Sequence, residues 1–185
     1  MFNVGQGNVS ATKVHKEKRS TLEQRADVVA SLVNSDSDAW AVWCDTDYEA
    51  DALTRRIPDA IEVRGSMPIK MKEERLEAFT SGKARVIVTK PRVGGLGLNW
   101  QHAHKTTWFA GYSFEQFYQA IRRLYRFGQK RTVQVHVVRS ENEGSIVQAV
   151  RDKERDHVEL QCEVARLMAD NMKAELGINS VQLVS

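Results

Sequence analysis

Apolar residues in this chain occur in two patterns that alternate along the sequence. The first pattern is a short run rich in β-branched and aromatic residues, bounded by Asp, Ser, Gly or Lys, as is typical of buried strands of a parallel sheet. We expect five such strands, at residues 39–44, 61–64, 85–89, 106–110 and 132–139.

The second pattern is a longer stretch with apolar positions three or four residues apart, which predicts amphipathic helices. These helices are expected at residues 22–34, 48–56, 69–81, 114–127 and 144–172. Pro68 precedes the third and Gly82 follows it, as start and stop signals, and Met71, Leu76 and Phe79 should form its inner face. At 1.5 Å per residue the last helix would be roughly 43 Å long, so we expect it to brace the domain or to reach a partner.

Strands that alternate with helices indicate βαβ crossovers and an α/β domain with a mostly parallel sheet. We expect this domain to span residues 21–140. A polar, glycine-bearing leader or linker at 1–20 should precede it, and a bracing helix at 141–173 and a tail at 174–185 should follow it.

The composition of the 185 residues, 42% hydrophobic and 28% charged, is ordinary for a globular protein. No apolar run approaches the ~18 residues of a membrane span, and the polar start lacks the apolar core of a signal peptide. We therefore expect an intracellular, cytoplasmic protein that does not contact a membrane. The two cysteines are far apart and the five histidines have no metal-ligand spacing, so no metal site is predicted.

The net charge of +3 is unevenly distributed. From residue 102 to residue 139 the single acidic residue is Glu115. The basic residues in this stretch are Lys105, Arg122, Arg123, Arg126, Lys130, Arg131 and Arg139. A patch of positive charge favours the binding of phosphates, either of a nucleotide or of a nucleic-acid backbone.

A glycine-rich segment follows the third expected strand, at the sheet edge where ligands bind in α/β folds. It reads TKPRVGGLGLNW, residues 89–100. Its glycines allow close approach to a ligand, its first residues can contact phosphate oxygens, and the Asn99 amide suits a ribose hydroxyl. A simple tight turn would explain the glycines equally well.

The expected helix 114–127 carries a sharper signal. Gln119, Arg123 and Arg126 are spaced i, i+4 and i+7, which predicts that they share one helical face. The arginines have no acidic residue within a turn, and arginine binds polyphosphate bidentately. The alternative is an arginine-rich face exposed to solvent.

Taken together, these segments resemble the motifs of superfamily 2 helicases. The segment that resembles motif VI, in its Swi/Snf-like form, is QAIRRLYRFGQ (119–129), and the segment that resembles motif V is TKPRVGGLGLNW. Residues 40–53, WAVWCDTDYEADAL, resemble the strand and helix of motif IV. Residues 64–79, RGSMPIKMKEERLEAF, are similar to the region between motifs IV and V. The resemblance covers residues 21–140, and the motif VI variant most resembles helicase-like proteins of phages and mobile elements.

The resemblance implies a RecA-like three-layer fold, the C-terminal lobe of a helicase or translocase. Arg126 matches the arginine finger that reaches the γ-phosphate of ATP, and Arg123 matches its companion. The residues implied to face the nucleotide are Gly95, Gly97, Asn99 and Gln119. The residues implied to contact the nucleic-acid backbone are Ser66, Thr89, Lys90 and Arg92. Arg122 stands where the family usually has an acid, and Pro91 stiffens a loop that is usually freer.

The sequence contains no GxxxxGK[ST] motif and no acidic box for Mg²⁺. In the family that the chain resembles, both belong to the N-terminal lobe, which would hold ATP and Mg²⁺. We therefore expect a fragment or half-enzyme that does not hydrolyse ATP alone. Its expected partners are an N-terminal RecA-like lobe and DNA, with duplex favoured by analogy; no oligomer is predicted. Two alternatives stay open: a non-catalytic nucleic-acid or protein-binding module, and a structural lobe whose last helix docks a partner.

Overall fold

The computed structural model describes residues 19–93, 98–109, 113–139, 152–153, 155–160, 162–163 and 166. The chain divides into two compact units, residues 1–147 and 148–185, each considered by itself. All described residues of the second unit are helical, in agreement with the last predicted helix. The rest of that helix, the leader up to residue 18 and the tail lie outside the described residues.

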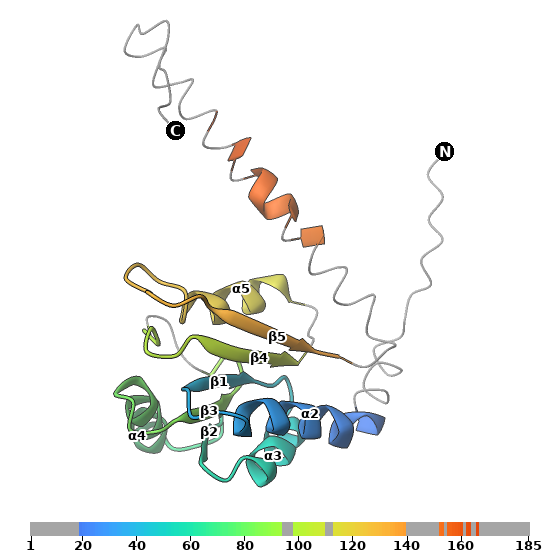
Figure 1. The fold of residues 1–185 in the computed structure, drawn as a ribbon, viewed down its shortest axis with the longest axis vertical. Helices are drawn as coiled ribbons and strands as arrows, with labels where there is room; N and C mark the ends of the chain where they lie inside the picture. Colours follow the sequence, from blue (N-terminus) through green and yellow to red (C-terminus); the bar gives the residue numbers. More distant parts are fainter. Residues whose placement is uncertain are drawn as a thin grey trace, which may run out of the picture. The chain divides into compact units, whose positions relative to one another are not determined.

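The first unit is built on a five-stranded sheet with the order β2-β3-β1-β4-β5 (Figure 1). Every neighbouring pair of strands is parallel. The strands are β1 (Trp40–Trp43), β2 (Ala60–Val63), β3 (Val86–Thr89), β4 (Lys105–Phe109) and β5 (Gln134–Val138). The five predicted strands are therefore confirmed, with ends that differ by one or two residues.

In the described part of this unit, four helices pack on the sheet. They are α2 (Leu22–Asn34), α3 (Asp47–Arg56), α4 (Ile69–Thr80) and α5 (Phe114–Arg122). Thr46 and Glu49 form a capping box at the start of α3, each side chain accepting a hydrogen bond from the other's backbone N–H. At the end of α4, Gly82 has a φ of 75°, a conformation that favours glycine.

The alternation of side chains along β1 shows why the sheet is covered on both faces. Trp40 and Val42 pack into a core with residues of α2 and α3, which lie side by side in Figure 1. Ala41 and Trp43 point the other way, into a second core that includes Phe79 of α4. Helices on both faces of a parallel sheet make the predicted three-layer α/β architecture.

Two sequence-based predictions about the helices are wrong. α5 ends at Arg122 instead of continuing to residue 127, so Arg126 does not share a helical face with Gln119 and Arg123. The helical hydrogen bonding stops here because the Arg123 carbonyl accepts from Trp100 N at 2.8 Å and the Leu124 carbonyl accepts from the Gln129 amide at 3.2 Å. On α4, Phe79 is buried as expected, but Met71 is 41% exposed.

Within the described ranges, no helix has both the length and the apolar character needed to cross a membrane.

Candidate functional site

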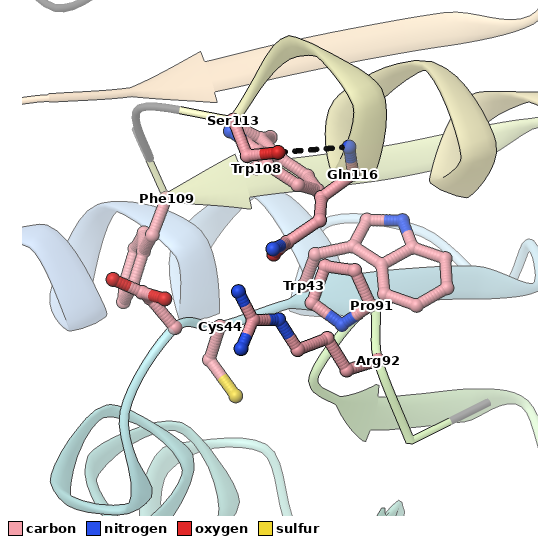
Figure 2. Close-up of a pocket in the computed structure, with 9 residues that line it drawn as sticks. Trp43, Cys44, Pro91, Arg92, Trp108, Phe109, Ser113 and Gln116 are labelled. Carbon is pink, nitrogen blue, oxygen red and sulfur yellow. Dashed lines mark hydrogen bonds between the residues drawn. The ribbon is translucent and has the colours of Figure 1, made fainter.

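The carboxyl edge of the sheet carries a cavity at the point where the strand order reverses. The chain proceeds from β1 to β2 and β3 on one side, then crosses to β4 on the other. The segments that follow β1, β3 and β4 therefore diverge above β1, and such a crevice is the usual ligand site of open α/β sheets. A cavity of about 200 Å³ lies there, bounded also by the start of α5 (Figure 2).

Two of the predicted backbone-contacting residues lie at this edge with exposed or half-exposed cations. Arg92 is exposed and lines the cavity. Its Nε and Nη2 lie 2.9 Å from the Gln116 side-chain amide, whose oxygen accepts from both when it is turned toward Arg92. Lys90 Nζ lies 2.9 Å from Asp47 Oδ1 in an ion pair whose lysine is 29% exposed. Both cations are held by short-range contacts yet remain open to solvent.

The other two predicted backbone-contacting residues differ from each other. Ser66 is exposed in the turn after β2, at the same carboxyl edge. Thr89 is 1% exposed, and its hydroxyl donates to the Val63 carbonyl at 2.9 Å. The Thr89 side chain therefore links β3 to β2.

Arg123, the first predicted phosphate-binding arginine, is built into the interior. It is 8% exposed and its guanidinium lies over two indole rings, 5.0 Å from the centroid of Trp43 and 5.6 Å from that of Trp100. Its Nη2 donates to the Pro91 carbonyl at 2.9 Å, and its own carbonyl accepts from Trp100 N at 2.8 Å. Burial lowers the pKa of this guanidinium. Through these contacts Arg123 holds Pro91 and Trp100, which flank the glycines of the glycine-rich segment.

Arg126 contacts the other end of the same segment and stays at the surface. It is exposed, and its Nη1 donates to the Leu98 carbonyl at 3.5 Å. The structure thus brings Arg123 and Arg126 to opposite ends of the glycine-rich segment, at Pro91 and Leu98. Gly95 and Gly97 lie between these ends, outside the described residues.

The remaining predicted nucleotide-facing residues are both exposed. Asn99 follows Leu98 directly, and its Oδ1 accepts from Gln101 N at 3.3 Å. Gln119 donates to Glu115 on the same helix at 3.0 Å. Asn99 therefore lies beside Arg126, whereas no contact in the described part of the chain joins Gln119 to either.

Several residues of the site were missed by the sequence analysis. Trp43 and Trp100, stacked on each other at 5.3 Å, come from distant segments, and no local pattern predicts their contact. Ser113 and Gln116 had a usable signal, because Ser-x-x-Gln at a helix start is a capping pattern; Ser113 Oγ accepts from Gln116 N at 3.3 Å. Cys44 also lines the cavity, but burial raises the pKa of its thiol, which disfavours the nucleophilic thiolate.

Comparison with solved structures identifies the fold. The C-terminal part of the Fun30 ATPase domain superposes with a TM-score of 0.59 at 15% identity, covering 69% of this chain and 44% of that one. The C-terminal domain of the DEAD-box protein Dbp5 gives 0.60 at 17% identity, covering 72% and 79%. S. cerevisiae Dbp5 bound to Gle1 and IP6 gives 0.64 at 16% identity, covering 73% of this chain and 37% of that one.

This chain spans less than half of the Fun30 chain and of the Dbp5 chain in that complex. No protein-family model and no curated protein matches the sequence. At these identities the likeness concerns the fold, and it confirms the predicted RecA-like three-layer α/β domain.

Proposed function

We propose that this chain is the second motor lobe of an ATP-dependent DNA helicase or translocase of the Swi/Snf-like kind. In this role it supplies an arginine to the nucleotide and backbone contacts to nucleic acid. The observation that carries the proposal is the placement of Arg126, an exposed guanidinium that touches the end of the glycine-rich segment. The similarity in fold to C-terminal parts of an ATPase domain and of a DEAD-box protein supports it.

ATP with Mg²⁺ would be held mainly by a separate P-loop lobe, because this sequence has no P-loop. Arg126 is exposed and contacts the carbonyl of Leu98, the residue before the exposed Asn99, so both residues can face one side of such a nucleotide. ATP supplies the phosphoryl group, and an arginine at this place neutralises charge on it. The segment 123–131, which follows α5, is here called the basic turn. Arg123 holds the glycine-rich segment against this turn, since its guanidinium contacts Pro91 and the two tryptophans.

Lys90, Arg92 and Ser66 are the residues we assign to the nucleic-acid backbone. Because phosphate neutralisation releases counterions, each lysine or arginine that contacts a phosphate adds about 1 to the slope of log affinity against log salt. Lys90→Ala and Arg92→Ala should each lower that slope by about 1, as measured by fluorescence anisotropy over a salt series.

Lys83→Ala is the matched control for these variants. Lys83 is an exposed lysine in the turn that precedes β3, at the opposite edge of the sheet, so its removal should leave the slope unchanged. If all three variants and the unmodified chain have equal slopes of log affinity against log salt, Lys90 and Arg92 do not contact nucleic-acid phosphates.

Reconstitution separates the motor from a non-catalytic binding module. Mixed with the P-loop lobe of the same enzyme, the chain should raise DNA-stimulated ATP hydrolysis well above that of the P-loop lobe alone. The measurement is phosphate release with and without duplex DNA. If the mixture binds DNA but hydrolyses no faster than the isolated P-loop lobe, the binding module is the correct description.

A further inference from the structure

The basic turn carries an aromatic side chain that lies entirely in solvent. Phe127 is 104% exposed, and Tyr125, two residues before it, is 59% exposed. Single apolar residues at the surface are common and need no explanation. Here, however, two exposed rings flank Arg126 in the chain, and both faces of the Phe127 ring are open to a ligand.

The backbone fixes the position of Phe127. Gln129 N donates to the Arg126 carbonyl at 3.0 Å, which closes a four-residue β-turn with Phe127 at its second position. Gly128, at the third position, has a φ of 96°, as a type II turn requires. The Phe127 carbonyl accepts a hydrogen bond from the Gln101 side chain. Because the turn is closed and anchored, a ligand that binds the ring has little backbone to order.

The surroundings of this ring are positively charged. Arg126 and Lys130 of the basic turn are exposed, as is Arg122 at the end of α5. The sequence contains no acidic residue from position 116 to position 139. A ligand that matches an exposed ring beside exposed cations combines a flat apolar group with negative charge. A nucleotide has both, since its base stacks on aromatic side chains and its phosphates bind arginine.

The basic turn lies away from the residues assigned to the nucleic-acid backbone. The Gln129 amide donates to the Ala103 carbonyl at 3.2 Å, in the segment that leads into β4. The turn is therefore near the end of the sheet where β4 and β5 begin (Figure 1), whereas Lys90 follows β3 at its carboxyl end. A strand bound at Lys90 would not run past Phe127. The nucleotide within reach of Phe127 is instead the one assigned to Arg126, the preceding residue of the same turn.

We propose that Phe127 stacks on the base of the ATP whose phosphates Arg126 contacts. The inference rests on the proposed function, in which a separate P-loop lobe holds this ATP. When the two lobes close, the β-turn would contact the nucleotide at two points, with the guanidinium at the phosphates and the phenyl ring at the base. Every base has a flat π-face, so Phe127 should strengthen nucleotide binding without selecting one base.

The test uses the full chain mixed with the P-loop lobe and measures the steady-state constants for ATP hydrolysis. Since stacking is worth a factor of about five or more in affinity, Phe127→Ala should raise the KM for ATP about fivefold or more. Its kcat should stay close to that of the unmodified chain, which is the signature of a lost binding contact. Phe127→Trp keeps a flat ring and should keep the KM, whereas Phe127→Leu should raise it. Val137→Ala, at a 42% exposed position of β5, is the matched control and should change neither constant.

A second measurement separates contact with the base from contact with the P-loop lobe itself. The affinity of the two lobes for each other, measured without nucleotide, should be the same for Phe127→Ala and the unmodified chain. An unchanged KM in Phe127→Ala would overturn the base contact, and so would an equally large loss of lobe affinity without nucleotide, which would place the ring on the P-loop lobe. Both outcomes leave Arg126 in its role. If the unmodified mixture hydrolyses ATP no faster than the P-loop lobe alone, the proposed function itself is wrong and the base contact is wrong with it.

Discussion

Replacing Arg126 by alanine is expected to abolish DNA-stimulated ATP hydrolysis in the two-lobed enzyme while DNA binding survives. An arginine that neutralises charge on the transferring phosphoryl group contributes about 1,000-fold or more to the rate. Arg126 is exposed, and substitutions of surface side chains usually change stability little, so its loss should leave the fold unchanged. Steady-state phosphate release and DNA anisotropy, measured on the same preparation, check both halves of the expectation.

Lys130→Ala provides the control for charge. Lys130 is exposed in the same basic turn, and its removal changes the net charge by the same amount as Arg126→Ala. We expect its hydrolysis rate to stay close to that of the unmodified enzyme. Hydrolysis that persists in Arg126→Ala would remove this residue from the finger role.

Arg123→Ala should behave differently, because Arg123 is part of the interior. The substitution removes the hydrogen bond to Pro91 and the two indole contacts, and it leaves a cavity. We expect a loss of about 2–4 kcal/mol in the free energy of unfolding. Urea denaturation therefore distinguishes the two arginines, which look equivalent in the sequence.

The difference in burial between Arg123 and Arg126 could not be predicted from the sequence. The glycine-rich segment and the basic turn could be recognised locally, and the structure places the turn against both ends of the segment. Whether an arginine is buried or exposed depends on partners far along the chain, here Trp43 and Trp100. The helical spacing of Gln119 and Arg126 was misleading because Trp100 and Gln129, from outside the helix, donate to the carbonyls of Arg123 and Leu124 where the helix ends.

The strands, by contrast, were predictable because their burial is local information. A short run such as WAVW has no polar position, so both of its faces must be covered. The cavity was not predictable, because its lining comes from β1, β4, the segments that follow β1 and β3, and the start of α5. Only the order of the strands brings those segments together.

A buried ion pair beside this cavity leads to the second large effect. Arg25 of α2 and Glu49 of α3 are 3% and 0% exposed, with Nη2 and Oε1 3.3 Å apart. The second carboxylate oxygen accepts from Asp45 N at 2.9 Å and Thr46 N at 3.0 Å, which fixes the turn that borders the cavity. The Arg25 guanidinium also lies 4.6 Å from the centroid of Phe109, a cavity wall.

Glu49→Ala is expected to lower the free energy of unfolding by about 3–5 kcal/mol, because it leaves a buried guanidinium without its carboxylate. Glu23→Ala is the matched control: Glu23 pairs with Arg56 but is 62% exposed, and surface pairs contribute at most about 1 kcal/mol. Chemical denaturation of both variants measures the contrast. A loss at Glu49 no larger than that at Glu23 would show that the buried pair is not coupled to folding.

The double variant Arg25→Met with Glu49→Gln separates the charge from the hydrogen bonds. Glutamine keeps an oxygen for the backbone N–H groups of Asp45 and Thr46, and methionine covers Phe109 without a charge to bury. Replacing a buried ion pair by groups of similar volume is often close to neutral, so the double variant should be more stable than either single variant.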